Sequence, residues 1–432
     1  MSLALALFAL VALVDATDNT TQCPNGCKCN EMLINGYHYS GVVCGLRETD
    51  VEHLTGQSYT FLSVNHFVEN LISLFMLNTS LPRVPASVCQ LPNLRELYLD
   101  GNNLTEVPYD CLTNLSRLLM LSASRNAITG LNGGIFDGLQ NLKRLYLDHN
   151  RIGGLHDGTF KGLQSLMILD LSHNRITGLH DGTFDGLQSL GSLDLSYNGI
   201  TFIGIRVFSN SSVLTRLRVL DLSYNKLTSL EPWWYYRCIL GSMMSPVVIN
   251  LNHNLISNFT NKLQFDFDCN MTVPFGFIDL GGNPITHFMD ILNGWNMTLL
   301  SFFKCVNYNP VGIFFTIFYI RGLNLACDCN DFELFQKARN RSHSQTFTIL
   351  RDVHCKKSNV YNNTPQSVLT SKVPLSDFVC HLSDHCPPSC QCVYRPENTT
   401  LHVNCSASNL SSLPFDLPPL PKSYVIYKLD FS

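Results

Sequence analysis

Leucines recur with a fixed period of 24 residues through the middle of the chain. The pattern LxxLxLxxN first falls on Leu94, Leu97, Leu99 and Asn102. Its asparagine then returns at the following positions: Asn126, Asn150, Asn174 and Asn198. Leu97 and Leu99 alternate along a short strand, so both point to one face and Tyr98 points to the other. The pattern predicts a row of short strands that each bury one face.

A 24-residue unit with this consensus is typical of the leucine-rich repeat. One unit cannot bury its own apolar face, so the units must stack. We therefore expect an α/β solenoid with a curved parallel sheet on the concave face, an irregular convex side and disulfide-bonded caps. The asparagines should bond free backbone groups and form a ladder inside the solenoid. Recurring phenylalanines should fill the core on the convex side: Phe136, Phe160, Phe184 and Phe208.

The repeats become less regular at both ends of this block. Residues 71–76 fit a preceding strand, with Thr79 in the asparagine position. Later asparagines continue the ladder at spacings of 27, 29 and 29 residues: Asn225, Asn254 and Asn283. We predict about nine to ten repeats over residues 71–323. The run Trp233–Tyr236 in an expanded loop either contacts a ligand or packs within that loop.

Composition and histidine spacing argue against several classes of function. Charged residues make up 14% of the chain, below the usual share of about a quarter, and the net charge of −4 offers no basic nucleic-acid surface. His149 and His173 should stack, either as a metal or pH-sensing pair or as a result of unit duplication. The same alternatives apply to other residues at the repeat spacing: His156 with His180, and Asp170, Asp194 and Asp221. No nucleophile, base and oxyanion donor converge, so we expect no enzyme and no cofactor.

The start of the chain predicts a leader. An apolar run over residues 3–14 ends at the small-residue site Val14–Ala16, which indicates a signal peptide over residues 1–16. The apolar run Val311–Ile320 is shorter than the about 20 residues that a membrane helix needs. We therefore expect a chain that is secreted into an oxidising compartment.

Seventeen cysteines fit such a compartment. Twelve of them form three clusters: Cys23, Cys27, Cys29 and Cys44; Cys327, Cys329, Cys355 and Cys380; and Cys386, Cys390, Cys392 and Cys405. Zinc is the rival explanation, but the signal peptide and the repeats favour disulfides, and four cysteines allow three pairings. Cys89 and Cys111 lie in adjacent repeats, so we hypothesise a bridge between them. A similar bridge between Cys238 and Cys269 would leave Cys305 free.

Sequons for N-linked glycosylation are spread along the chain. Thirteen match, and Asn404 is set aside because its middle residue, Cys405, belongs to a cysteine cluster. The others are expected glycosylation sites of a secreted chain: Asn19, Asn78, Asn103, Asn114, Asn210, Asn258, Asn270, Asn296, Asn340, Asn362, Asn398 and Asn409.

The cysteine clusters resemble the flanking caps of extracellular leucine-rich-repeat proteins. The first and third, spaced CxxxCxC, resemble N-terminal caps, and the second, which begins CDC, resembles a C-terminal cap. The resemblance implies these bridges: Cys23–Cys29, Cys27–Cys44, Cys327–Cys355, Cys329–Cys380, Cys386–Cys392 and Cys390–Cys405. It implies these boundaries: a cap over residues 17–70, a C-terminal cap over 324–382, a second N-terminal-type cap over 383–423 and the start of a further repeat over 424–432.

A C-terminal cap followed directly by a new N-terminal-type cap resembles the ectodomain of Toll-type receptors with multiple cysteine clusters. The most specific stretch runs from CDCNDFELFQ at Cys327 to HVNCSASNLSSLP at His402. The resemblance implies an extracellular ectodomain that recognises a protein ligand, such as a cystine-knot cytokine, or a microbial pattern. It also implies dimerisation on the ligand and innate-immune or developmental signalling. We interpret the chain as a truncated receptor whose missing C-terminal segment would hold it at the cell membrane.

The sequence is also compatible with two other classes of protein. A Slit-like guidance protein also joins repeat blocks through paired caps, and a soluble decoy or matrix-binding protein would have no membrane anchor. In each class the chain would bind a partner with a rigid curved surface. The leucine alternation turns the following candidate ligand-binding residues outward: Glu96, Tyr98, Arg144, Tyr146 and Ile168.

Overall fold

The computed structural model describes residues 9–14, 27–34, 37–45, 71–78, 80–84, 88–91, 93–204, 207, 216–229, 247–257, 276–287, 290, 318–319, 323–328, 330–333, 336, 354–358, 365–369, 374–382, 386, 390–405 and 426–430. The chain forms two compact units, Met1–Leu227 with Trp233–Asn250, and Thr228–Pro232 with Leu251–Ser432. Within the described ranges, no helix has both the length and the apolar character needed to cross a membrane.

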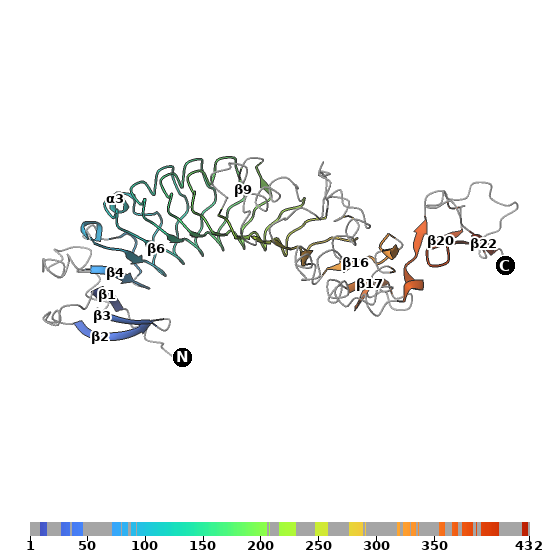
Figure 1. Ribbon diagram of the computed structural model, residues 1–432, viewed down its shortest axis with the longest axis horizontal. Helices are drawn as coiled ribbons and strands as arrows, with labels where there is room; N and C mark the ends of the chain where they lie inside the picture. The colour runs from blue at the N-terminus through green and yellow to red at the C-terminus, as the bar shows by residue number, and fades with distance from the viewer. Residues whose placement is uncertain are drawn as a thin grey trace. The chain divides into compact units, whose positions relative to one another are not determined.

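A parallel sheet of short strands runs through the first unit. Its strands follow chain order: β4 (Leu71–Met76), β5 (Glu96–Tyr98), β6 (Met120–Ser122), β7 (Arg144–Tyr146), β8 (Ile168–Asp170), β10 (Ser192–Asp194), β12 (Val219–Asp221) and β13 (Val247–Asn250). In Figure 1 these strands lie side by side along one edge of the solenoid, and the returning segments with α3 (Tyr109–Leu112) lie along the opposite edge. This arrangement confirms the predicted leucine-rich-repeat solenoid.

The repeated apolar residues form the core between the two edges. Leu97 and its register partners Leu121 and Leu145 are fully buried. Phe160 lies between Phe136 and Phe184, with ring centroids 6.0 Å apart on each side. All three phenylalanines are buried, which confirms their predicted role; Phe208 lies outside the described residues.

The asparagine ladder is present along the sheet. Asn150 Nδ2 donates to the carbonyl oxygens of Ala123 at 2.9 Å and Leu147 at 3.0 Å. Asn150 Oδ1 accepts the backbone N–H of Ile128 at 3.0 Å. The same three bonds recur at these positions: Asn102, Asn126, Asn174, Asn198 and Asn225, and Asn283 in the second unit. Each asparagine therefore ties its own repeat to the preceding one.

The N-terminal part of the first unit is antiparallel. β2 (Cys27–Ile34) and β3 (Tyr37–Gly45) form a hairpin whose register pairs Cys27 with Cys44. β1 (Ala9–Val14) lies between β3 and β4 and pairs with both in antiparallel fashion. The apolar run at the start of the chain is therefore a strand here, and its cleavage as a signal peptide stays a prediction.

The second unit contains further repeat strands and the regions of both predicted later caps. β14 (Gly276–Asp279) and β15 (Phe318–Tyr319) are parallel. A three-stranded sheet follows: β16 (Asn324–Leu325), β17 (His354–Ser358) and β18 (Pro365–Leu369). The last sheet has four strands: β19 (Cys380–Leu382), β20 (Gln391–Arg395), β21 (Thr400–Asn404) and β22 (Ile426–Asp430). β20 and β21 form a hairpin, and β22 runs parallel to β21 in the manner of a first repeat strand.

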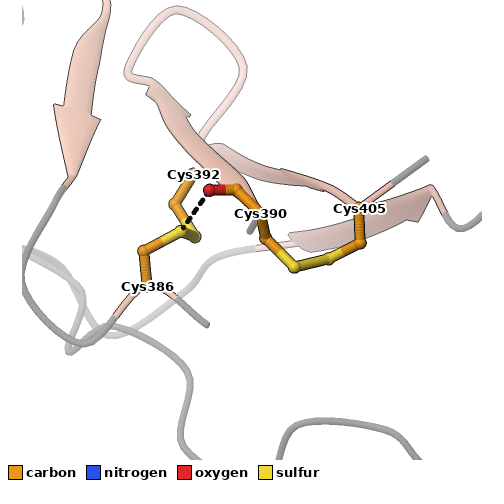
Figure 2. Close-up of a disulfide and its surroundings, with 4 residues drawn as sticks. All are labelled: Cys386, Cys390, Cys392 and Cys405. Atoms are coloured by element: carbon orange, nitrogen blue, oxygen red, sulfur yellow. Dashed lines mark hydrogen bonds between the residues drawn. A yellow bond between two sulfur atoms is a disulfide. The ribbon is translucent and has the colours of Figure 1, made fainter. Parts of the chain in front are cut away.

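Disulfides hold the caps together. Four bridges join cysteines that the sequence analysis paired: Cys89–Cys111, Cys327–Cys355, Cys386–Cys392 and Cys390–Cys405. The first joins α3 to the short 3-10 helix η2 (Val88–Gln90). Figure 2 shows the last two, which staple the β20–β21 hairpin. Cys380 is also disulfide-bonded. The remaining predicted pairings involve cysteines outside the described residues, Cys23, Cys238, Cys269 and Cys329, or cysteines described only by their backbone, Cys27, Cys29 and Cys44. Cys305, which was predicted to be free, also lies outside the described residues.

Candidate ligand-binding surface

Two columns of side chains cover the outward face of the sheet from β5 to β8. The register places Glu96, Met120, Arg144 and Ile168 in one column, and Tyr98, Ser122, Tyr146 and Asp170 in the other. Neighbouring strands lie about 4.8 Å apart, so side chains within a column are direct neighbours. All five candidate residues fall in these two columns, and four of them are half-buried while Arg144 is exposed. We call this surface the sheet face.

At the β5 end of the sheet face, hydrogen bonds and ring stacking fix the candidate side chains. Glu96 Oε2 accepts hydrogen bonds from Ser73 Oγ at 3.0 Å and from the Tyr98 hydroxyl at 3.4 Å. The Tyr98 ring stacks on Phe75 with centroids 4.2 Å apart and planes 6° apart. Such fixed side chains lose little conformational entropy when a ligand binds.

The β7 strand offers the residue types that dominate protein interfaces. Arg144 is exposed between Met120 and Ile168, and Tyr146 is half-buried between Ser122 and Asp170. Arginine and tyrosine are enriched among residues that carry most of the binding energy of interfaces. This strand is therefore the strongest part of the candidate surface.

A column of aspartates continues the sheet face from β8 to β12. Asp170, Asp194 and Asp221 are register partners, and each accepts the backbone N–H of the serine two residues later at 2.8–2.9 Å. Burial raises the pKa of the Asp170 and Asp194 carboxyls, and the negative charge of the next aspartate along the column raises it further. Hydrogen bonds from Ser172 and Ser196 oppose these effects. The aspartates thus cap the turns of their own repeats.

Exposed apolar side chains extend the sheet face to β13. Val219 on β12 and Val248 on β13 are register partners, with exposed fractions of 40% and 37%. They continue the column that contains Arg144 and Ile168. The sequence analysis missed them because they lie in the longer repeats, where the spacing changes.

A second feature that the sequence analysis missed is a column of stacked rings. The ring column consists of His149, His173, Tyr197 and Tyr224, each exposed and each directly before a ladder asparagine. Successive ring centroids lie 4.1, 4.2 and 4.2 Å apart. This confirms that His149 and His173 stack. Tyr197 and Tyr224 are not identical to the histidines of the earlier repeats, so residue identity does not indicate them, whereas their position directly before a ladder asparagine does.

Backbone conformation brings the rings into line. His149, His173, Tyr197 and Tyr224 all have φ between 52° and 54°, in the left-handed region. Because each repeat turns in the same way at this position, each ring lies over the next. A side-chain hydrogen bond with Tyr224 raises the pKa of Tyr197.

The other histidine pair has a structural explanation. Thr159 Oγ1 donates to the carbonyl oxygen of His156 at 2.8 Å, and Thr183 Oγ1 donates to that of His180 at 2.7 Å. The His180 ring packs edge-on against Phe202, with centroids 5.0 Å apart. These histidines therefore belong to a duplicated turn, as the HDGTF repetition suggests.

One group of side chains in the described part of the chain has the composition and proximity of a metal site. His287, Asp328 and Asp331 each offer one ligand atom, and these atoms lie within 4.8 Å of one another. All three belong to the second unit. Burial lowers the pKa of His287, but the hydrogen bond to Asp328 and the charges of Asp328, Asp331 and Asp290 outweigh burial, so the net shift is upward.

Comparison with known families places the repeats and one cap. The family Leucine rich repeat matches residues 92–152, 140–200 and 216–238. The family Leucine rich repeat N-terminal domain matches residues 385–418, within the predicted second N-terminal-type cap. With the parallel sheet and the asparagine ladder, these matches define a leucine-rich-repeat protein.

The chain is related to Protein toll of Drosophila melanogaster, with 27% identity over 229 residues, which is 50% of this chain and 16% of that protein. The solved Toll–Spatzle complex from Drosophila contains a chain with the same fold: its TM-score is 0.51 at 22% identity, covering 78% of this chain and 42% of that chain. Human 5T4 aligns with a TM-score of 0.44 at 19% identity, covering 84% of this chain and 100% of that chain. The chain thus spans less than half the length of the Toll proteins that it matches.

Proposed function

We propose that this chain is the extracellular ligand-binding part of a Toll-like receptor, which takes a protein ligand on the sheet face and dimerises around it. The observation that carries the proposal is the relationship to Protein toll together with the order of modules. A repeat block ends in the cap bridged by Cys327–Cys355, and a second N-terminal-type cap follows at residues 385–418. Leucine-rich-repeat proteins of this kind bind partners rather than catalyse reactions.

The nature of the ligand follows from the related structure and the shape of the surface. The solved Toll structure is a complex with Spatzle, and Spatzle is therefore the natural first ligand to test. The eight strands from β4 to β13 span about 35 Å at the usual strand spacing, which is enough for a standard protein interface. Arg144 and Tyr146 lie within this span and are the residues on which we expect binding to depend most.

The experiment is surface plasmon resonance with the glycosylated chain and purified Spatzle. Arg144→Glu and Tyr146→Ala should each weaken binding at least about tenfold, as expected for central arginine and tyrosine contacts. Lys161→Glu is the matched control, because Lys161 is exposed on a returning segment outside the sheet. Unchanged binding by both sheet-face variants would exclude the sheet face, and no binding by the native chain would exclude Spatzle as the ligand.

The same proposal includes secretion and glycosylation. Four of the twelve expected glycosylation sites lie within the described residues, and all four are exposed: Asn78, Asn103, Asn114 and Asn398. Glycans there would be compatible with the fold and would solubilise a chain with only 14% charged residues. Cell-surface attachment would then depend on a segment that follows these residues in the receptor.

A further inference from the structure

The His287 side chain lies between carboxylates that come from two different segments of the second unit. Its Nε2 atom lies 2.9 Å from Asp328 Oδ2, and its Nδ1 atom lies 3.5 Å from Asp290 Oδ2. Thr286 Oγ1 is 3.1 Å from the same Nδ1 atom. One ring nitrogen thus faces Asp328 and Asp331, while the other is oriented by groups on its own segment.

This arrangement matches the two shells of a histidine that binds a metal. Metal-bound histidines usually donate their second ring N–H to a carboxylate, which fixes the ring orientation and makes the ligating nitrogen more basic. On that side of His287, Thr286 Oγ1 is the hydrogen-bond partner of Nδ1 at 3.1 Å, and the Asp290 carboxylate lies 3.5 Å from the same atom. Atoms bound to tetrahedral zinc lie about 3.4 Å apart at bond lengths of about 2.1 Å, within the spread of the three candidate atoms here.

The charge of the group also favours a dication. Asp331 is fully buried, and Asp328 and Asp290 are half-buried. Three carboxylates, those of Asp328, Asp331 and Asp290, lie around one imidazole. Buried carboxylates are ordinarily paired with a cation or bound to a metal ion. A divalent metal ion would fit this group of ligands.

Backbone contacts fix both segments before any metal binds. Ala326 N–H donates to the Thr286 carbonyl oxygen at 2.7 Å, which joins the strand leading into the cap to the end of the preceding repeat. Asp328 Oδ1 accepts the Asn330 backbone N–H at 2.8 Å. Cys327, next to Asp328, is bridged to Cys355. The candidate ligands are therefore presented by a rigid turn.

We propose that His287, Asp328 and Asp331 form a structural zinc site that clamps the C-terminal cap to the last repeats of the solenoid. One imidazole and two carboxylates, with water in the fourth position, suit zinc, whereas calcium and magnesium select oxygen ligands alone. The site adds a metal-stabilised junction to the fold and is independent of the Toll-like ligand binding proposed above.

Zinc titration of the untagged, glycosylated full chain tests the proposal. The protein is stripped with EDTA and dialysed into metal-free buffer, and ZnCl2 is then titrated by isothermal calorimetry, with thermal unfolding followed in parallel. We expect one saturable site per chain and a zinc-dependent rise in Tm. His287→Gln and Asp328→Asn should each weaken zinc binding more than about 100-fold, and Asp290→Asn should weaken it about 10- to 100-fold by releasing the ring.

His173→Gln is the matched control, because His173 is an exposed histidine of the ring column in the first unit. This variant should bind zinc as tightly as the native chain and show the same rise in Tm. Asp328 is used in preference to the fully buried Asp331 so that the variant folds. Absence of a saturable site, unchanged binding by His287→Gln and Asp328→Asn, or displacement of zinc by millimolar calcium would each overturn the proposal.

Discussion

At the scale of single residues, the aspartate column makes stability depend on pH. Asp194 lies between Asp170 and Asp221, and its burial raises the pKa above the ordinary value of 3.8. A carboxyl with a raised folded-state pKa stabilises the fold when it is protonated. That contribution is complete below pH 3.8 and is lost as the pH rises through the folded-state pKa. At neutral pH the ionised carboxylates of Asp170 and Asp194 therefore lower the stability of the repeats.

Asp194→Asn should raise Tm at neutral pH, and the gain should disappear as the pH falls below the ordinary aspartate pKa of 3.8. The amide oxygen can still accept the N–H of Ser196, so the turn is kept. Asn250 already continues this column on β13, where its Nδ2 donates to Asp221 Oδ2 at 2.9 Å. Thermal unfolding over a pH series measures the effect, with exposed Asp157→Asn as control. A lower Tm for Asp194→Asn at neutral pH would contradict the prediction.

The sequence identified the interior of the repeats more completely than their surface. A polar residue such as Asn150 that recurs among buried leucines must form hydrogen bonds within the core. The ladder confirms that it does. The ring column depends instead on left-handed backbone at residues such as Tyr197, which the spacing of leucines does not specify. Its chemistry also varies from histidine to tyrosine, so identity between repeats could not reveal it.

At the scale of elements, the last cap depends on its disulfides. Among the residues of this module that the structure describes, the hydrophobic core is a small cluster: Cys392, Tyr394, Leu401, Val403 and Cys405. Small modules with such cores usually need covalent staples. The two bridges drawn in Figure 2 supply them, and two of the bridged cysteines are themselves part of this core.

Removal of the bridge between Cys390 and Cys405, by replacing both with alanine, should loosen this module alone. The bridge closes a loop with a sequence separation of 15, which corresponds to about 3 kcal/mol of stabilisation. Amide exchange in β20 and β21 should then accelerate about 100-fold. Hydrogen-exchange mass spectrometry measures this, with β5 to β8 of the same molecule as an internal control. Unchanged exchange in the hairpin would show that its core is sufficient without the bridge.

At the scale of elements, the spacing of cysteines was more informative than the spacing of leucines. The CxxxCxC cluster before residue 405 predicted an N-terminal-type cap, and a hairpin followed by a parallel repeat strand is present there. Spacing was less informative between residues 284 and 323, where the ladder asparagines end. β15 still pairs with β14, with Phe318 opposite Ile278 in the register.

At the scale of the whole molecule, the two predicted N-terminal-type caps differ in one respect. In the later cap, the hairpin strand β21 pairs directly and in parallel with the repeat strand β22. In the first cap, β1 separates the hairpin strand β3 from the repeat strand β4. The strand that makes the difference lies within the predicted signal peptide over residues 1–16. Removal of that peptide would free the facing edges of β3 and β4 to pair with each other.

The secreted protein should therefore begin after Ala16, with β3 paired directly to β4 as β21 is to β22. Intact-mass analysis of the deglycosylated protein and N-terminal sequencing locate the cleavage site. Hydrogen exchange then compares the secreted chain with a chain expressed without residues 1–16 and refolded with its disulfides. Strong protection of Leu74 and Phe75 in both would agree with direct pairing of the cap and the first repeat, and rapid exchange in both would contradict it. If the secreted chain retained residues 9–14, β1 would be a permanent strand of the sheet. The prediction that residues 1–16 are a cleaved signal peptide would then be wrong.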